Sequence, residues 1–266
     1  MMKGINKTGA FPLLLLFAGG LILLFILAPI GGMILSVAPG HIREVMAEPV
    51  VTRSIGLTLW TSMAATLLFG LGAIPLAYVL ARYRFRGKRV IQGIINLPIV
   101  IPHSAAGIAL LGVISRDSWL GGLAASVGFD LIGNPFSIVI AMAFVSVPFL
   151  VNAATDAFEE VPEKLEQAAL NLGASRARVF FTVALPLARR GILTGLVMMW
   201  ARGMSEFGAV VIIAYHPMTA PVLIYDRFTS FGLRYATPVA VLFVLVTLVL
   251  FVAMRFLAAR TRKNRV

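Results

Sequence analysis

The chain contains no cysteine, and only 13% of its 266 residues are charged. The absence of cysteine excludes disulfide bonds, thiolate metal ligands and a cysteine nucleophile. Hydrophobic residues make up 59% of the chain, whereas about half of a soluble domain is apolar. The charge that remains is one-sided, because 23 residues are Lys or Arg and 11 are Asp or Glu.

The sequence also lacks a nucleotide-binding motif. Its one Gly-Lys pair, Gly87-Lys88, is followed by Arg89 where a phosphate-binding loop has serine or threonine. Arg82 stands where such a loop begins with glycine. We therefore expect no ATP site on this chain.

No set of residues in the sequence has the spacing of a catalytic or metal site. His41, His103 and His216 are too far apart for a metal pair at helical spacing. The stretch 203–207 resembles a nucleophile elbow, but it ends in Phe207 instead of glycine and lies in an apolar run. We expect a protein that is not an enzyme and that binds no metal or cofactor itself.

Apolar runs of about twenty residues recur along the chain, which is the length a helix needs to cross a bilayer. The alternating pattern of an outer-membrane barrel is missing. The sequence therefore predicts an all-α membrane protein with six transmembrane helices. Their expected ranges are Phe11–Val37, Gly56–Ala81, Val90–Ile114, Ser137–Ala157, Gly191–Ala214 and Thr237–Leu257.

Basic residues are concentrated on one predicted side of the membrane. With the amino terminus inside, 17 of the 23 basic residues fall in the two termini and in the connections after the second and fourth spans. Because cytoplasmic segments carry an excess of Lys and Arg, we expect both termini in the cytoplasm. Topology and anionic lipid account for the net charge of +12, so nucleic acid is not an expected partner.

The segment 158–190 interrupts the membrane pattern. Gly173 predicts the end of one short helix, and Ser175 predicts the N-cap of a second one. Pro186 predicts the end of that second helix before the fifth span. The residues fit either an amphipathic anchor on the lipid or a docking surface for another protein. A narrow apolar stripe at helical spacing runs through the first helix: Val161, Leu165, Ala168, Ala169 and Leu172.

The order Gln167-Ala168-Ala169, Gly173 and Leu185-Pro186 resembles the cytoplasmic signature of permease subunits in bacterial and archaeal ABC importers of type I. Glutamine stands in the place of the signature's glutamate, and Glu166 immediately precedes it. The resemblance covers roughly residues 53–255. It implies an N-terminal helix with an external connector (1–52), a transmembrane domain (53–256) with a coupling loop (158–190), and a basic cytoplasmic tail (257–266).

In that family the loop docks on a separate ATPase subunit. The resemblance therefore implies ATP and Mg²⁺ on a partner chain, and a homodimer in the cell membrane with two ATP-binding cassette subunits. It also implies an external substrate-binding protein, for which 38–55 and 215–236 are candidate docking segments. The residues expected to couple this chain to the ATPase are Glu166, Gln167, Ala168, Ala169, Leu172, Gly173, Ala174, Ser175 and Arg176.

Two charged residues, Arg202 and Glu206, lie four apart inside the expected fifth span, so they share one face of a helix. A charge at the bilayer centre costs on the order of 3 kcal/mol, so the pair should face protein or water. In one interpretation the two charges neutralise each other and lock helix packing. In the other their face lines a pathway, where Arg202 attracts an anion and Ser205 offers a hydroxyl.

The stretch Ser205–Ala209 resembles the fifth-span motif of permeases for molybdate, tungstate and sulfate, and Asn96–Leu111 resembles their proline-rich third span. Pro98 and Pro102 are expected to kink or unwind that span. His103 stands where the family usually has another proline, and it is either a packed residue, a pore-lining donor or a local variation. The resemblance implies these candidate pathway residues: Pro102, His103, Arg202, Ser205, Glu206 and Phe207.

Two other classes fit the sequence less well. An ion-coupled secondary transporter is expected to have intramembrane acids and inverted repeats, whereas Glu206 is the only acid well inside an expected span. An intramembrane enzyme would need a nucleophile with its base or a metal set. The sequence favours the permease of an ATP-driven importer that moves molybdate or tungstate by alternating access, with sulfate or thiosulfate as the alternative.

Overall fold

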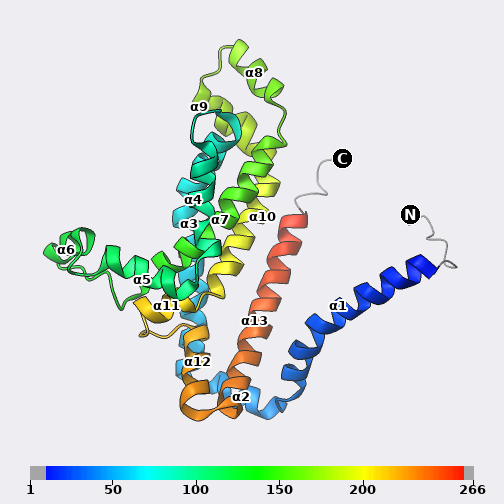
Figure 1. Cartoon of the computed structure of the whole chain (residues 1–266), viewed down its shortest axis with the longest axis vertical. Helices are drawn as coiled ribbons and strands as arrows, with labels where there is room; N and C mark the ends of the chain where they lie inside the picture. The colour runs from blue at the N-terminus through cyan, green and yellow to red at the C-terminus, as the bar shows by residue number, and fades with distance from the viewer. Residues whose placement is uncertain (1–9, 261–266) are drawn as a thin grey trace.

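The computed structural model describes residues 10–260, and this part of the chain is helical without strands (Figure 1). The prediction of an all-α protein is confirmed. Lys3, Lys7 and the basic residues after Arg260 lie outside the described residues. The helices are α1 (Ala10–Leu35), α2 (Pro39–Ala47), α3 (Pro49–Arg82), α4 (Lys88–Val100), α5 (His103–Ile114), α6 (Trp119–Ser126), α7 (Pro135–Glu159), α8 (Glu163–Asn171), α9 (Arg176–Val179), the π-helix η1 (Phe180–Ala184), α10 (Leu185–Met204), α11 (Gly208–Ile213), α12 (Ala220–Phe231) and α13 (Leu233–Arg260).

Five helices in the described chain are long and apolar enough to cross a membrane: α1, α3, α7, the continuous helix Arg176–Met204, and α13. The helices α4 and α5 meet the same test only together, as a pair bent by 114°. The structure therefore matches the predicted six spans if this pair is counted as one span.

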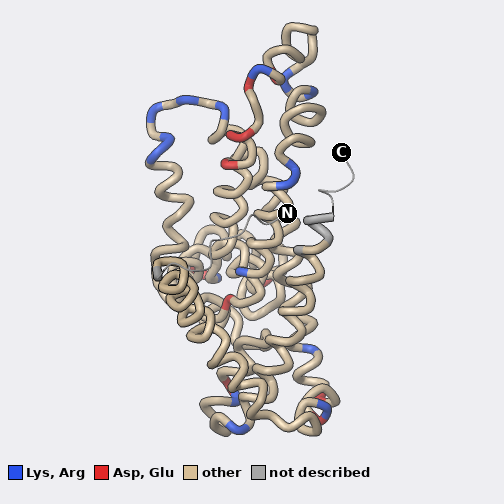
Figure 2. The backbone as a smooth tube through the Cα atoms, turned by 90° about the vertical axis from the view of Figure 1, so that its right-hand side faces the viewer, with Lys and Arg blue, Asp and Glu red and all other residues tan. Residues whose placement is uncertain are grey.

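The long helices run between two opposite ends of the molecule (Figure 1). One end carries α8 and α9 and is called the α8 end. The other carries α2 and α12 and is called the α12 end. At the α8 end, Figure 2 shows Lys and Arg in the connection between α3 and α4 and in the segment around α8, with Asp and Glu near the latter. Basic and acidic residues also mix at the α12 end. The structure thus brings together the basic segments that the sequence assigns to one side.

The helix α7 forms the centre of the bundle, because it lies between α3 and α10 and packs along both. Its start is fixed by a capping box, in which the Asn134 side chain accepts from the N–H groups of Phe136 and Ser137 at 2.8 and 3.1 Å. Pro135 occupies the first turn, where its missing N–H costs nothing. Most of the buried residues of the long helices belong to α7 and its two neighbours.

Small residues let α7 and α10 approach closely. A Cβ atom added to Gly191 would lie 2.3 Å from the Cβ of Ala157, and one added to Gly195 would lie 3.0 Å from the Cβ of Ala153. Contact between backbones through small residues is a common way to join helices in lipid, where no hydrophobic force drives association. The Gly191–Gly195 pattern therefore serves packing within the chain.

The outer elements are less embedded. Figure 1 shows α1 leaning away from the bundle and α5 and α6 projecting sideways from it. Every large apolar side chain of α1 from Phe11 to Ile30 is exposed. In the membrane, lipid or protein must cover such a surface.

The prediction that Pro186 ends a helix before the fifth span is wrong. The helix runs without a break from Arg176 to Met204, and Pro186 lies in the first turn of α10. The preceding turn widens into the π-helix η1, where the Leu185 N–H bonds to the Phe180 carbonyl. A π-turn of this kind accommodates the proline, whose ring would otherwise crowd the turn before it.

The fifth span also differs from its prediction at its C-terminal end. We expected one helix over Gly191–Ala214, but α10 ends at Met204 and α11 begins at Gly208. The expected third span is also broken, between α4 and α5. There the prediction of a kink is confirmed, since Pro102 is the N-cap of α5, while Pro98 stays inside α4.

Two expected domain boundaries fall inside helices. The boundary between residues 52 and 53 lies within α3, which begins at Pro49. The expected tail begins at residue 257, but α13 continues to Arg260.

We expect Gly191→Ala to destabilise the protein, because its methyl group would force α7 and α10 apart. Without a clash, alanine for glycine in a helix stabilises by about 1 kcal/mol, whereas overpacking a close contact costs about 1–3 kcal/mol. The measurement is the thermal unfolding midpoint of the purified protein in detergent. Gly72→Ala in α3 is the matched control, since nothing lies within 4 Å of its added Cβ. Equal midpoints for both variants would contradict the role given to Gly191.

Candidate functional site

The two broken helices meet at their breaks. The α4–α5 break lies at Ile101 and Pro102, and the α10–α11 break lies at 205–207. A Cβ atom on Gly208 would lie 2.6 Å from the Cβ of His103, and one on Gly107 would lie 2.9 Å from the Cβ of Ile212. The first turns of α5 and α11 are thus in direct contact. We call this place the break junction and define it by His103, Arg202, Ser205 and Glu206.

A charged cluster holds the break junction together. Arg202 Nη2 donates to Glu206 Oε2 at 2.9 Å and lies 2.9 Å from His103 Nε2. Arg202 Nη1 lies 3.4 Å from the Ser205 hydroxyl. Because a guanidinium only donates, its bond to His103 requires an unprotonated ring nitrogen there.

Glu206 is the buried member of the cluster. Its side chain is 1% exposed, against 20% for Arg202 and 43% for His103. Its second oxygen, Oε1, accepts from the Ala209 N–H at 2.8 Å and so bonds one of the free donors at the start of α11. The carboxylate therefore joins the end of α10 to the start of α11.

This geometry contains the ion pair of the first interpretation, while the second, a pathway lined by these residues, stays a prediction. The ion pair of Arg202 and Glu206 exists, and it fixes packing at the break. The two residues do not lie on one continuous helix, however, because Glu206 belongs to the break after α10. One edge of the cluster, formed by His103 and Arg202, stays open in the single chain.

The other predicted pathway residues lie around the break junction in different ways. Pro102 is exposed and directly precedes His103. Phe207 turns away, because its ring packs on the Tyr225 ring of α12 with centroids 4.9 Å apart. Ser205 lines a cavity of about 280 Å³ between α10 and α13. The structure thus joins His103, Arg202, Ser205 and Glu206 and separates Phe207 from them.

A polar pair between α4 and α7 was not identified from the sequence. The Asn152 amide donates to Asn96 Oδ1 at 2.7 Å, and Asn152 is exposed in the single chain. Asn96 lies within the stretch that resembles the proline-rich third span. Two amide side chains inside apolar helices can be recognised in the sequence as polar residues that need partners. Which residues they pair with depends on the fold.

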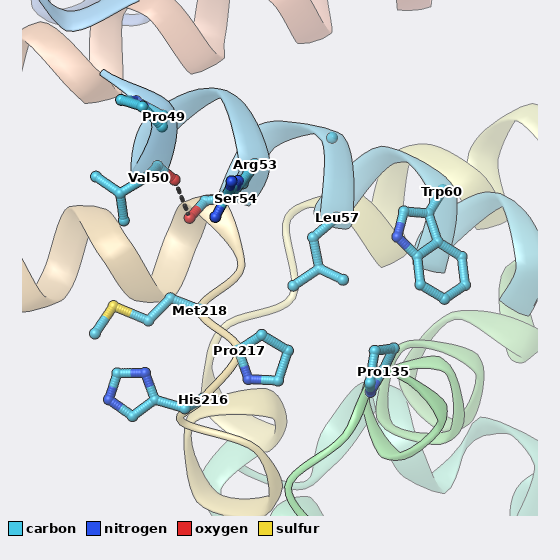
Figure 3. Close-up of a pocket in the computed structure, with 11 residues that line it drawn as sticks. Pro49, Val50, Arg53, Ser54, Leu57, Trp60, Pro135, His216, Pro217 and Met218 are labelled. Atoms are coloured by element: carbon cyan, nitrogen blue, oxygen red, sulfur yellow. Dashed lines mark hydrogen bonds between the residues drawn. The ribbon is translucent and has the colours of Figure 1, made fainter.

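A larger cavity lies toward the α12 end. It has a volume of about 820 Å³ and is lined on one side by α3 from Pro49 to Trp60 and on the other by His216, Pro217 and Met218 (Figure 3). Arg53 is the one charged residue in this lining, and no acid contributes to it. We call this space the Trp60 cavity.

Most of the expected coupling residues form an exposed surface at the α8 end. Gln167, Ala168, Leu172, Gly173, Ser175 and Arg176 are exposed, while Ala169 and Ala174 are half-buried. The Leu165 and Leu172 side chains are 47% and 89% exposed. Leu170 of α8 is 40% exposed as well.

The turn between α8 and α9 has the predicted geometry. Gly173 has a φ of +88°, which residues with a side chain rarely adopt. Ser175 caps α9 by accepting from the Arg178 N–H at 3.3 Å. Both predictions made from Gly173 and Ser175 are confirmed.

Glu166 differs from the other expected coupling residues because it is buried. Only 7% of the residue is exposed. Its carboxylate accepts from Arg82 and from the Tyr78 hydroxyl, both on α3. Sequence reasoning used Arg82 as a mismatch to a phosphate-binding loop and counted it among the basic residues that set the topology, and it did not single out Tyr78.

Among residues 10–260, no three His, Asp or Glu side chains come close enough together to hold a metal ion. The chemistry that the described side chains offer at the break junction is charge pairing and hydrogen bonding.

Comparison with known families identifies the class of this membrane protein. Residues 73–263 match the family model described as "Binding-protein-dependent transport system inner membrane component". The chain belongs to this family.

Named relatives refine this assignment. The chain is 44% identical over 221 residues to the molybdate/tungstate transport system permease protein WtpB of Pyrococcus furiosus, covering 83% of this chain and 84% of that one. It is 36% identical over 218 residues to the probable sulfate transport system permease protein cysT of Chlorokybus atmophyticus, covering 80% and 76%.

The fold itself is found in solved transporters. A chain of the bacterial alginate ABC transporter, in complex with alginate pentasaccharide-bound periplasmic protein, superposes with a TM-score of 0.75. The match covers 96% of both chains at 18% sequence identity. The predicted importer fold is thereby confirmed.

We expect Arg202→Leu to destabilise the protein by about 3 kcal/mol, because it leaves the buried Glu206 carboxylate without its counter-ion. The double variant Arg202→Leu/Glu206→Gln removes both charges, keeps an oxygen that accepts from the Ala209 N–H, and should regain most of the lost stability. Thermal unfolding of the single and double variants measures both effects. We expect the folded double variant to remain defective in transport, and full transport activity would show that Arg202 serves packing alone.

Proposed function

We propose that this chain is the membrane-spanning subunit of an ATP-driven importer for the tetrahedral oxyanions molybdate and tungstate. Two copies form the pathway, and it alternates between openings to the two sides of the membrane. The α8 end faces the cytoplasm, in agreement with the concentration of basic residues there.

The observation that carries the substrate assignment is the 44% identity to a molybdate/tungstate permease along 83% of this chain. The break junction supports it physically. Interrupted helices are a common way to build substrate sites in transporters, because the start of a half-helix is electropositive. Arg202 and His103 add hydrogen-bond donors at the open edge of the junction, and Glu206 holds Arg202 in position without lying at that edge.

ATP and Mg²⁺ bind to a separate ATPase subunit, and two such subunits dock on the two copies of this chain. The exposed surface formed by Gln167, Ala168, Leu172 and Arg176 is the docking site. A loaded external binding protein docks on the segments 38–55 and 215–236 at the α12 end. The permease fold and family membership support partners of this kind.

Sulfate is the second candidate substrate, because a probable sulfate permease is 36% identical to this chain. Sulfate has the same charge and tetrahedral shape as molybdate but is smaller. Transport experiments with the complete system distinguish the two.

We expect proteoliposomes that contain this chain and its ATPase subunit to take up radiolabelled molybdate. ATP is supplied on the side of the ATPase subunit, and the binding protein loaded with molybdate is supplied on the opposite side. Excess unlabelled tungstate should abolish this uptake. The sulfate concentration that halves uptake should be at least about tenfold higher than the tungstate concentration that does so, a discrimination of about 1.4 kcal/mol. The binding protein alone, titrated with the three anions, provides the control. Stronger competition by sulfate would reverse the substrate assignment.

We expect Gly173→Val to uncouple ATP hydrolysis from uptake. Valine at a φ of +88° is strained, so the α8–α9 turn must change its shape and the docking surface with it. Uptake per ATP hydrolysed, measured in proteoliposomes, should fall while the protein remains inserted. Gly87→Val is the matched control, because Gly87 has a φ of +91° at the same end of the molecule but precedes α4. Equal coupling ratios in the two variants would remove the special role of the turn.

A further inference from the structure

We propose that Glu166 is the positioning residue that ties α8 to α3, so that movement of the docking segment reaches the Trp60 cavity directly through α3. The proposal rests on the proposed function, since the movement comes from the docked ATPase subunit. It adds a second mechanical route to the covalent one, in which α8 continues through α9 into α10.

The contact itself is extensive for a single carboxylate. Glu166 Oε1 accepts from Arg82 Nε at 2.8 Å and from Arg82 Nη2 at 2.7 Å, and Glu166 Oε2 accepts from the Tyr78 hydroxyl at 2.7 Å. Arg82 Nη2 also donates to the Val161 carbonyl at 2.9 Å, in the linker before α8. Both charged side chains are 9% exposed. Charge-assisted bonds shielded from water hold their geometry better than exposed pairs.

Neighbouring aromatic rings fix the Tyr78 hydroxyl. The Tyr78 ring meets the rings of Phe158 and Phe180 edge-on, with centroids 5.2 and 4.9 Å apart. Phe158 lies at the end of α7, and Phe180 begins η1. The ends of α3 and α7 and the start of η1 therefore converge around Glu166.

The remaining attachments of α8 are weak. Apart from Glu166 and the half-buried Ala169, every residue of α8 is exposed. Its connections on both sides are short turns, one at Glu160–Pro162 and one at Gly173, which fix its orientation poorly on their own. The Glu166 contact is thus the element that makes α8 move together with the bundle.

The helix α3 is suited to transmit this movement. It is a single helix of 34 residues with Tyr78 and Arg82 at one end. At the other end its residues Val50, Arg53 and Trp60 line the Trp60 cavity (Figure 3). A displacement of its α8 end therefore changes the position of that lining, without passing through the break junction.

The test uses the complete transporter in proteoliposomes, with the ATPase subunit bound. Because the chain contains no cysteine, Val50→Cys introduces a single thiol, and its reaction rate with a charged thiosulfonate reports on the Trp60 cavity. We expect this rate to differ between the nucleotide-free and the ATP-vanadate states, and Glu166→Gln to abolish the difference. ATP hydrolysis should continue, while uptake per ATP should fall at least about fivefold, the lower end of typical coupling between sites.

Two further variants define the role of the carboxylate. Glu159→Gln is the matched control, because it removes a carboxylate at the same end of the molecule. The Glu159 side chain is half exposed, and its contact to Lys88 is longer, at 3.8 Å. We expect wild-type coupling and labelling in this variant. The exchange Arg82→Glu/Glu166→Arg should restore part of the state-dependent labelling, which a residue needed only for stability would not do.

Wild-type uptake per ATP together with wild-type state-dependent labelling in Glu166→Gln would overturn the proposal. If Glu166→Gln does not assemble, the double variant Arg82→Gln/Glu166→Gln decides, because it removes the ion pair without leaving a buried charge unpaired. Unchanged labelling and coupling in that variant would equally overturn the proposal. The labelling needs no oxyanion, so it decides alone if the proposed substrate is wrong and uptake cannot be measured. A wild-type complex that does not hydrolyse ATP would instead contradict the proposed function.

Discussion

The contact between Arg202 and Glu206 is the interaction on which the interrupted architecture depends. Hydrocarbon offers no hydrogen bonds, so a helix can break inside a membrane only where protein or water satisfies the freed polar groups. Here the break after α10 is bridged by Glu206, which binds the Arg202 guanidinium on one side and the Ala209 N–H on the other. The same guanidinium reaches His103 at the start of α5 and so joins the second interrupted helix to the first.

The rest of the bundle keeps this junction in place by close packing. The helices α3, α7 and α10 contact one another through small residues, and α5 and α11 do so at Gly107 and Gly208. Such contacts leave little freedom to slide, because close-packed interiors shift between discrete arrangements and do not deform continuously. A transporter needs this property, since its two access states must be distinct.

Much of the fold could be predicted because hydrophobic length and charge distribution are local signals. The five single spans, the turn at Gly173 and the cap at Ser175 follow from residues close together in the sequence. The break after Met204 could not be predicted in this way, since the stretch 191–214 is mostly apolar and contains no proline. Pro186 was misinterpreted because a π-turn, which depends on the surrounding packing, lets a helix continue through it. The partner of Glu166 lies 84 residues away in the sequence, so only the folded chain identifies it.

The continuous helix from Arg176 to Met204 has a mechanical consequence. Its 29 residues correspond to a rod about 44 Å long. If such a rod tilts by about 5°, one end moves by about 4 Å relative to the other, which exceeds the length of a hydrogen bond. The break junction sits at the end of this rod opposite to α8, so a small change in angle at the docking surface is amplified where His103, Arg202 and Glu206 meet.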